Sequence, residues 1–272
     1  MPSYVVTGAG RGLGVEFLRQ LSENPEAIVI GLVRNVEAAK KKAAEIGRPN
    51  IHIVHGDLDD YESLKKAAEE TAKITGGSLD YLIANGAYIS YYSAFLGLFD
   101  LSENPKALDE DLEKSFRTNV NGNIHLINLF LPLIRKGQAK KVISISTGAA
   151  DFALIKQYKV EPSAPYAMSK AALNIAIAKY HAELSGEGIL FLSISPGVVA
   201  TDANAPPITT EKEQKKAQEM YASFAKYAPH FKGPITPKES VEKVMGVIYD
   251  SSLEKGDGGA FVSHLGRGQP WL

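Results

Sequence analysis

A tyrosine and a lysine four residues apart, Tyr166 and Lys170, are the residues of this sequence best suited to moving a proton. If their segment is helical, both side chains leave the same face, one turn apart. An ammonium about 4 Å from a phenol, at an effective dielectric constant of about 20, favours the phenolate by roughly 4 kcal/mol. The pair therefore predicts a tyrosine whose pKa is lowered by up to about three units, into the range useful for general acid or base catalysis. An ordinary helix with an exposed tyrosine and lysine is the alternative.

A glycine-rich turn follows the first predicted strand. Residues 3 to 7 have the composition of a buried strand, and TGAGRGLG at 7 to 14 leads into a predicted helix. Gly8 permits a tight turn, Gly12 lets the backbone approach a pyrophosphate at the helix N-terminus, and Gly14 allows the helix to pack closely on the strand. The strand, turn and helix in this order predict a dinucleotide-binding site.

The end of the second predicted strand, residues 27 to 35, is where a dinucleotide-binding fold selects its cofactor. An acidic residue there would bind the adenosine ribose and repel a 2′-phosphate, but the sequence has Arg34, with Arg11 in the glycine turn. Two guanidiniums suit a phosphate group. The sequence thus predicts NADP(H) rather than NAD(H), with a merely solvated Arg34 as the alternative. The lysine run in the predicted helix at 36 to 47 is interpreted as a solvated face.

Further candidate cofactor contacts follow the third and fourth predicted strands. Asp57 is placed to accept from the adenine amino group and Leu58 to flank the ring, whereas Asn85 and Gly86 lie where ligands bind, beyond the carboxyl ends of parallel strands. The aromatic-rich stretch at 88 to 105 predicts either a substrate wall or a satellite core under a long loop.

A polar patch interrupts the segment from about 109 to 136, which is predicted to form one long helix or two. Residues 118 to 123 bring threonine, asparagine and glycine into a helix interior, against local propensity. Because local rules often fail at functional sites, this patch, with Asn119 in it, is a candidate part of the active site.

A strand predicted at 140 to 147 ends in two hydroxyls, those of Ser146 and Thr147. The helix that carries Tyr166 follows, with Ser163 as its predicted N-cap and Pro165 in its first turn.

Strands alternate with helices along the whole chain, which predicts an α/β fold. We expect one doubly wound, Rossmann-type domain over residues 1–272, with a mostly parallel seven-stranded sheet, helices on both faces and a substrate-loop insertion at about 202–237.

Composition excludes several functions. Thirty basic and 31 acidic residues give a formal net charge of -1, so no global field attracts nucleic acid or an anionic membrane. The absence of cysteine excludes disulfides and thiolate chemistry. His52 and His55 would point to opposite faces of a strand, so we expect no metal site. Without a recognisable leader peptide or a long apolar run, we expect a cytoplasmic protein.

With these motifs in this order, the sequence resembles a classical short-chain dehydrogenase/reductase over essentially its whole length. The matching elements are TGAGRGLG, Asp57-Leu58, ANGA at 84 to 87, Asn119 in RTNVNG, ISIST, YAMSK, and PGVVAT at 196 to 201. The arginine pair and the long gap before Tyr166 are similar to the carbonyl-reductase and C-factor-like members, including fungal homologues.

The resemblance implies a role for each matching residue. Tyr166 would protonate a carbonyl oxygen as NADPH delivers hydride, Lys170 would lower the pKa of Tyr166 and bind the nicotinamide ribose, and Asn119 would hold a water in a relay to Lys170. The implied contacts to NADP(H) are Gly8, Arg11, Gly12, Leu13, Gly14, Arg34, Asp57, Leu58, Asn85, Gly86, Tyr166, Lys170, Pro196, Gly197, Val199 and Thr201.

This sequence departs from the family pattern at the hydroxyl that positions the substrate. Alignment of ISIST on the family's strand puts Thr147 at the usual serine position, with Ser146 as the alternative. Tyr166 follows Thr147 by nineteen residues, more than the family's usual dozen or so, so the loop between them must bulge outward.

The resemblance implies an NADPH-dependent carbonyl reductase or alcohol dehydrogenase that acts on a small, fairly apolar ketone, aldehyde or alcohol. The substrate loops would be 88 to 105, 150 to 162 and 202 to 235. The alternatives are an NADP(H)-binding regulator and a biosynthetic enzyme that uses the pocket for a non-redox step. Members of the family often form homodimers or homotetramers, and no nucleic acid or membrane partner is expected.

Overall fold

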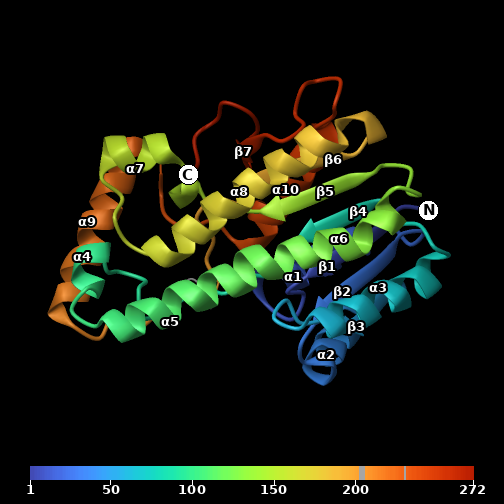
Figure 1. Ribbon diagram of the computed structural model, residues 1–272, viewed down its shortest axis with the longest axis horizontal. Coiled ribbons are helices and arrows are strands. Elements are labelled where there is room, and N and C mark those ends of the chain that lie inside the picture. Colours follow the sequence, from blue (N-terminus) through green and yellow to red (C-terminus); the bar gives the residue numbers. More distant parts are fainter. Residues whose placement is uncertain (202–205, 230) are drawn as a thin grey trace.

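The computed structural model describes residues 1–201, 206–229 and 231–272. A seven-stranded sheet in the order β3-β2-β1-β4-β5-β6-β7 forms its centre, and each neighbouring pair of strands is parallel. The strands are β1 Ser3–Thr7, β2 Ile28–Val33, β3 Ile51–His55, β4 Tyr81–Ala84, β5 Lys141–Ile145, β6 Leu190–Ser195 and β7 Phe261–Ser263. The strand order reverses between β1 and β4, which confirms the predicted doubly wound α/β fold (Figure 1).

Helices cover both faces of the sheet. They are α1 Gly12–Leu21, α2 Val36–Ile46, α3 Tyr61–Thr75, α4 Leu98–Leu101, α5 Pro105–Phe116, α6 Asn123–Ile134, α7 Phe152–Tyr158, α8 Ala164–Leu184, α9 Glu211–Tyr227 and α10 Pro237–Asp250. None of these helices, within the described ranges, has the length and hydropathy needed to cross a membrane.

Two hydrophobic cores lie on opposite faces of the sheet. One packs Val6 of β1 against side chains of α1 and α10, and the other packs Val5 of β1 against α3, α6 and α8. Because both faces are covered, the strands other than the edge strand β3 are buried along nearly their whole length and do not alternate between buried and exposed residues.

The helix predicted from about 109 to 136 begins earlier and has three parts. Asn104 caps its start, since the Asn104 side chain accepts a hydrogen bond from the Ala107 amide at 3.2 Å. Between α5 and α6, residues Arg117–Gly122 form a π-helical turn, which coincides with the polar patch. Such turns often occur at functional sites. A side chain at Gly122 would approach the Leu58 carbonyl oxygen within 2.3 Å, so this turn packs directly on the loop after β3.

The prediction that the Ser163 side chain caps α8 is wrong. Ser163 has a left-handed backbone with φ of 57°, and its hydroxyl donates to the Ala94 carbonyl at 2.8 Å. Its amide donates to the Ser93 carbonyl at 3.0 Å. Contacts to a distant segment thus take the place of the local cap, while Pro165 does lie in the first turn of α8.

The three predicted substrate loops contain helices that pack together at one end of the molecule (Figure 1). The Lys212 ammonium of α9 lies 3.1 Å from the Asp100 carboxylate of α4, and the Lys216 ammonium lies 2.8 Å from Glu161, before α8. The insertion at about 202–237 is therefore not simply a loop, because it contains the 17-residue helix α9. Its residues 202–205 and 230 lie outside the described ranges.

Candidate active site

The glycine turn can be built only from glycine at its key positions. Gly8 and Gly12 have φ of 66° and 53°, in the left-handed region. A side chain at Gly8 would meet the Gly86 Cα at 2.8 Å, and one at Gly14 would meet the Gly8 carbonyl oxygen at 2.2 Å. The turn is thus closely packed between β1, α1 and the segment after β4, and it offers the bare backbone that a pyrophosphate needs.

Thr7, at the end of β1, joins this turn to the end of β4. Its hydroxyl accepts a hydrogen bond from the Gly86 amide at 2.8 Å, and its carbonyl accepts one from the Asn85 side chain at 2.9 Å. Thr7 is not among the site residues predicted from the sequence. A hydroxyl placed directly before the glycine turn is the signal that could have identified it.

Three cationic side chains lie on the turn or on the elements that follow it. Arg11 and Arg34 are both exposed, Arg11 at the start of α1 and Arg34 after β2. The Lys42 ammonium of α2 donates to the Gly10 carbonyl at 2.9 Å. The lysine run of α2 is therefore not only a solvated face, because it brings a third cation to the turn.

Asp57 and Leu58 take different positions after β3. An Asp57 carboxylate oxygen accepts from the Asp59 amide at 3.1 Å, and the Asp57 side chain is partly exposed. A side chain at Gly86 would meet the Leu58 Cδ1 at 3.1 Å. The structure therefore brings Leu58 and Gly86 together at the carboxyl edge of the sheet.

Asn119 is fully buried in the π-helical turn, and its side chain makes three hydrogen bonds. Its Oδ1 accepts from the Tyr88 amide at 2.7 Å, and its Nδ2 donates to the Tyr88 carbonyl and the Ser169 hydroxyl, each at 2.9 Å. The Asn119 side chain thus connects the segment after β4 to α8, one residue from Lys170.

Lys170 lies almost entirely inside the protein, with 1% of its surface exposed. Its ammonium donates to the Ile145 carbonyl, at the end of β5, at 2.7 Å. Burial lowers the pKa of Lys170 to about 8, because desolvation disfavours the charged form.

The pKa of Tyr166 is raised in this structure, not lowered as the spacing of Tyr166 and Lys170 predicted. Tyr166 is partly exposed and lies one turn before Lys170 in α8, as predicted, but burial raises the pKa of its phenol. Desolvation disfavours a phenolate just as it disfavours an ammonium, and the Lys170 ammonium is directed at the Ile145 carbonyl. The spacing of the two residues in the sequence does not reveal this desolvation cost.

Ser146 and Thr147 differ in their surroundings. Ser146 is 2% exposed, and its hydroxyl has no hydrogen-bond partner within the described ranges. Thr147 is partly exposed, and its hydroxyl accepts from the Ala149 amide at 3.2 Å, which starts a short helical turn over Gly148–Ala150. Of the two side chains, that of Thr147 is the more exposed, and it lies at the carboxyl end of β5.

The loop after β6 lies against both the glycine turn and α10. A side chain at Gly12 would meet the Thr201 Cγ2 at 3.4 Å. The Ser240 hydroxyl of α10 donates to the Pro196 carbonyl at 2.7 Å. Val199 forms a bridge with Ile235, which fixes the middle of the loop.

Gly197 of this loop packs on His264, which is not among the site residues predicted from the sequence. Gly197 has φ of 82°, and a side chain there would meet the His264 ring at 2.9 Å. His264 is 3% exposed, and burial lowers its pKa to about 4, so the ring is neutral at physiological pH.

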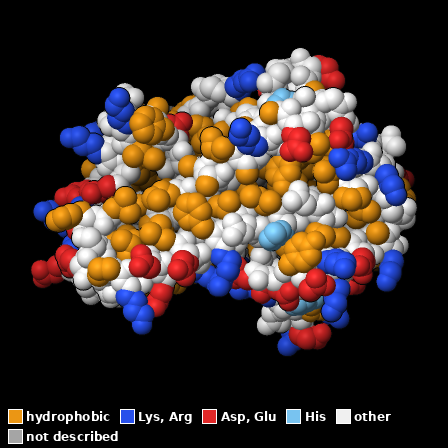
Figure 2. Space-filling model, viewed as in Figure 1, with side chains coloured by type: hydrophobic (Ala, Val, Ile, Leu, Met, Phe, Trp, Pro, Cys, Tyr) orange, Lys and Arg blue, Asp and Glu red, His pale blue; other side chains and the backbone are white. Residues whose placement is uncertain are grey.

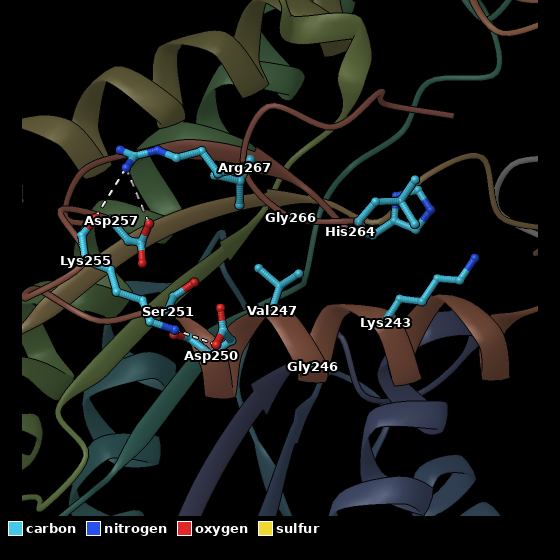
Figure 3. A pocket seen from close by; sticks show the side chains of 12 residues that line it. Lys243, Gly246, Val247, Asp250, Ser251, Lys255, Asp257, His264, Gly266 and Arg267 are labelled. Atoms are coloured by element: carbon cyan, nitrogen blue, oxygen red, sulfur yellow. Dashed lines mark hydrogen bonds and ion pairs between the residues drawn. The ribbon is translucent and has the colours of Figure 1, made fainter.

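His264 also lines a cavity of about 560 Å³ between α10 and the segment after β7 (Figure 3). In this view Arg267 points toward Asp257, and Lys255 toward Asp250. Arg267 also donates to the Gly256 carbonyl at 2.8 Å, so much of the charge in this cavity is already paired.

The predicted site residues thus gather along the carboxyl edge of the sheet in two connected groups. The first holds the glycine turn with Leu58, Asn85, Gly86 and Thr201. The second holds Asn119 and Lys170, linked through Ser169 and the end of β5. Arg11 and Arg34 are exposed at the outer side of the first group.

Comparison with known proteins identifies the family. The family model described as short chain dehydrogenase matches residues 3–246. The short chain dehydrogenase virK of Hypocrea virens is 50% identical over 276 residues, and the short-chain dehydrogenase/reductase AacuF of Aspergillus aculeatus is 48% identical over 273, with 100% of each chain covered. This chain belongs to the short-chain dehydrogenase family of oxidoreductases, which confirms the resemblance.

A solved structure has a similar fold. The NADPH-bound carbonyl reductase from chicken fatty liver superposes with a TM-score of 0.76 at 23% identity, over 100% of this chain and 99% of the other.

Proposed function

We propose that the protein is an NADPH-dependent carbonyl reductase that reduces an apolar ketone or aldehyde. The observation that carries the proposal is the buried Lys170 one helical turn from Tyr166, at the crevice edge where the glycine turn also lies. A buried ammonium beside a phenol is an arrangement for proton transfer, and the glycine turn suits a dinucleotide.

In this reaction NADPH, when bound, supplies the hydride that adds to the carbonyl carbon. Tyr166 supplies the proton that the carbonyl oxygen then requires. Because burial raises the pKa of Tyr166, its phenol is protonated before the substrate arrives. We propose that proton transfer draws the Lys170 ammonium, which is mostly charged at neutral pH with a pKa of about 8, from the Ile145 carbonyl toward the phenolate left behind.

Two further residues orient this centre. The Thr147 hydroxyl donates a hydrogen bond to the substrate oxygen, where charge develops during hydride addition. Three hydrogen bonds hold the Asn119 side chain on Tyr88 and Ser169, so we assign its water relay to Lys170 to the main-chain carbonyl. That carbonyl also accepts a hydrogen bond from the Asn123 side chain at 2.9 Å.

Three cations support NADP(H) over NAD(H). Arg11 and Arg34 are exposed at the turn, without the acidic residue that would repel a 2′-phosphate, and Lys42 reaches the Gly10 carbonyl. The chicken fatty liver neighbour is NADPH-bound. The remaining proposed cofactor contacts, Leu13 among them, are carried over from the family motifs.

Apolar side chains support an apolar substrate. Figure 2 shows hydrophobic side chains gathered between α5 and α8, toward the end where α4 and α7 lie. Large exposed hydrophobic residues are present in the first two predicted substrate loops, including Phe99 at 90% and Phe152 at 78% exposure.

The proposed activity is tested by mixing the purified protein with NADPH and a panel of ketones and aldehydes, and following the absorbance of the reduced nicotinamide. We expect oxidation of NADPH by at least one apolar carbonyl, and a loss of about 100-fold or more in kcat for Tyr166→Phe, since the proton donor is removed. The variant should still bind NADPH through the glycine turn and the other cofactor contacts. Tight NADPH binding without turnover of any carbonyl would instead indicate a cofactor-binding regulator or a non-redox enzyme.

Arg34→Ala should raise the KM for NADPH by about tenfold or more and leave that for NADH nearly unchanged, because only NADPH carries the phosphate that the guanidinium binds. Lys40→Ala is the matched control, since Lys40 is an exposed cation of α2 paired only loosely with Glu37 at 3.7 Å. Equal changes for both cofactors in Arg34→Ala would refute the assignment.

Thr147→Ala should lower kcat by about 100-fold, as expected for the loss of one donor to a developing oxyanion, and Thr147→Ser should restore most of it. Ser146→Ala should have a small effect, because the buried Ser146 hydroxyl makes no bond within the described ranges. The role belongs to Ser146 if Ser146→Ala abolishes turnover while Thr147→Ala stays active.

A further inference from the structure

The side chain of Trp271 lies directly against the turn that follows Thr147. A side chain at Gly148, the next residue, would meet the Trp271 Cβ at 2.6 Å and its Cγ at 2.9 Å. Gly148 is buried and begins the helical turn that the Thr147 hydroxyl caps. Trp271 is therefore in contact with the residue adjacent to the proposed substrate-positioning hydroxyl.

Two aromatic residues from other elements contact Trp271, and a third packs on one of them. Its ring stacks on Phe261 of β7, with centroids 4.3 Å apart and an interplanar angle of 16°. Its amide donates to the Tyr227 hydroxyl of α9 at 2.9 Å, and Tyr227 packs edge-on against Tyr158 of α7 at 5.1 Å. We call Phe261, Trp271, Tyr227 and Tyr158 the Trp271 cluster. Figure 1 accordingly shows the end labelled C beside α7.

The segment before Trp271 is also fixed. The Ser263 hydroxyl donates to the Pro270 carbonyl at 2.6 Å, and Ser263 forms a bridge with Gly266. His264 in the same segment packs on Gly197 of the loop after β6. Residues 261 to 271 therefore contact both the loop proposed to hold the nicotinamide and the turn beside Thr147.

The Trp271 cluster is not closed off as a core would be, because all four of its members are partly exposed. Aromatic rings that remain open to a crevice can stack a flat ring of a ligand, which is favourable beyond simple apolar burial. The neighbouring α7 and α9 come from the segments predicted to contact substrate, so the cluster lies where a substrate wall is needed.

We propose that Trp271 is a specificity-determining residue that forms the substrate wall beside Thr147 and selects a flat, aromatic carbonyl substrate. The proposal rests on the proposed function, since it assigns the substrate class of the same site. The ring of the substrate stacks against the Trp271 cluster, which presents its carbonyl group to Thr147 and Tyr166.

Acetophenone and methyl cyclohexyl ketone test this selectivity, because they share one carbon skeleton and differ in whether the ring is flat. We expect the wild type to prefer acetophenone, and Trp271→Ala to lower kcat/KM for acetophenone by about tenfold through KM, with a change below about threefold for the saturated ketone. Trp271→Phe should retain the preference, and the KM for NADPH should be unchanged in both variants. Tyr221→Ala is the matched control, since Tyr221 is a 50% exposed aromatic residue of α9 outside the cluster.

The position of Trp271 can be measured without turnover, because it is the one tryptophan of the sequence. Bound NADPH should quench the Trp271 emission by energy transfer to the nearby nicotinamide, and acetophenone should quench it further. The proposal is overturned if bound NADPH leaves this emission unchanged. It is also overturned if the wild type reduces the saturated ketone as well as acetophenone, or if Trp271→Ala loses activity on the two ketones equally. Failure to bind NADPH, or to reduce any carbonyl, overturns the proposed function itself.

Discussion

The burial of the Lys170 ammonium is the constraint on which the rest of the site depends. Moving a charged group out of water costs several kcal/mol unless the protein supplies polar partners. The Ile145 carbonyl at the end of β5 is such a partner, and the remaining cost appears as a pKa lowered to about 8. The position of β5 in the middle of the sheet, between β4 and β6, brings this carbonyl under α8 at the carboxyl edge, where a cofactor binds in doubly wound folds.

The π-helical turn between α5 and α6 serves the same centre. A regular helix would not favour asparagine, threonine and glycine in its interior, but here Asn119 bonds both the Tyr88 backbone and Ser169, and Gly122 lets the turn approach the Leu58 carbonyl. One irregular turn therefore fixes the segment after β4 and the loop after β3 against α8. These contacts explain why a locally unfavourable sequence forms a well-packed structure.

The sequence was sufficient for features that depend on local patterns, and insufficient for those that depend on distant contacts. The strands, the glycine turn and the helix position of Tyr166 follow from periodicity and residue type. The sign of the Tyr166 pKa shift depends on burial, and the backbone of Ser163 depends on residues nearly seventy positions away. Lys42 and Trp271 likewise meet the site only through folding, so no local motif marks them. Spacing in the sequence predicts which side chains of a helix are neighbours, but not how far each one is removed from water.

The most direct test of the central claim, that the buried Lys170 supports proton donation by Tyr166, is the pH dependence of kcat/KM for carbonyl reduction by NADPH. The Lys170 pKa is lowered from 10.5 to about 8, so its ammonium is present below this value and lost as pH rises through it. We predict a wild-type activity that falls as pH rises through about 8, and no such fall in a folded, NADPH-binding Lys170→Arg variant, whose guanidinium does not titrate there. The account would be contradicted if the wild-type kcat/KM stayed constant until the pH approached 10.5, the ordinary pKa of lysine, or if the variant showed the same fall as the wild type.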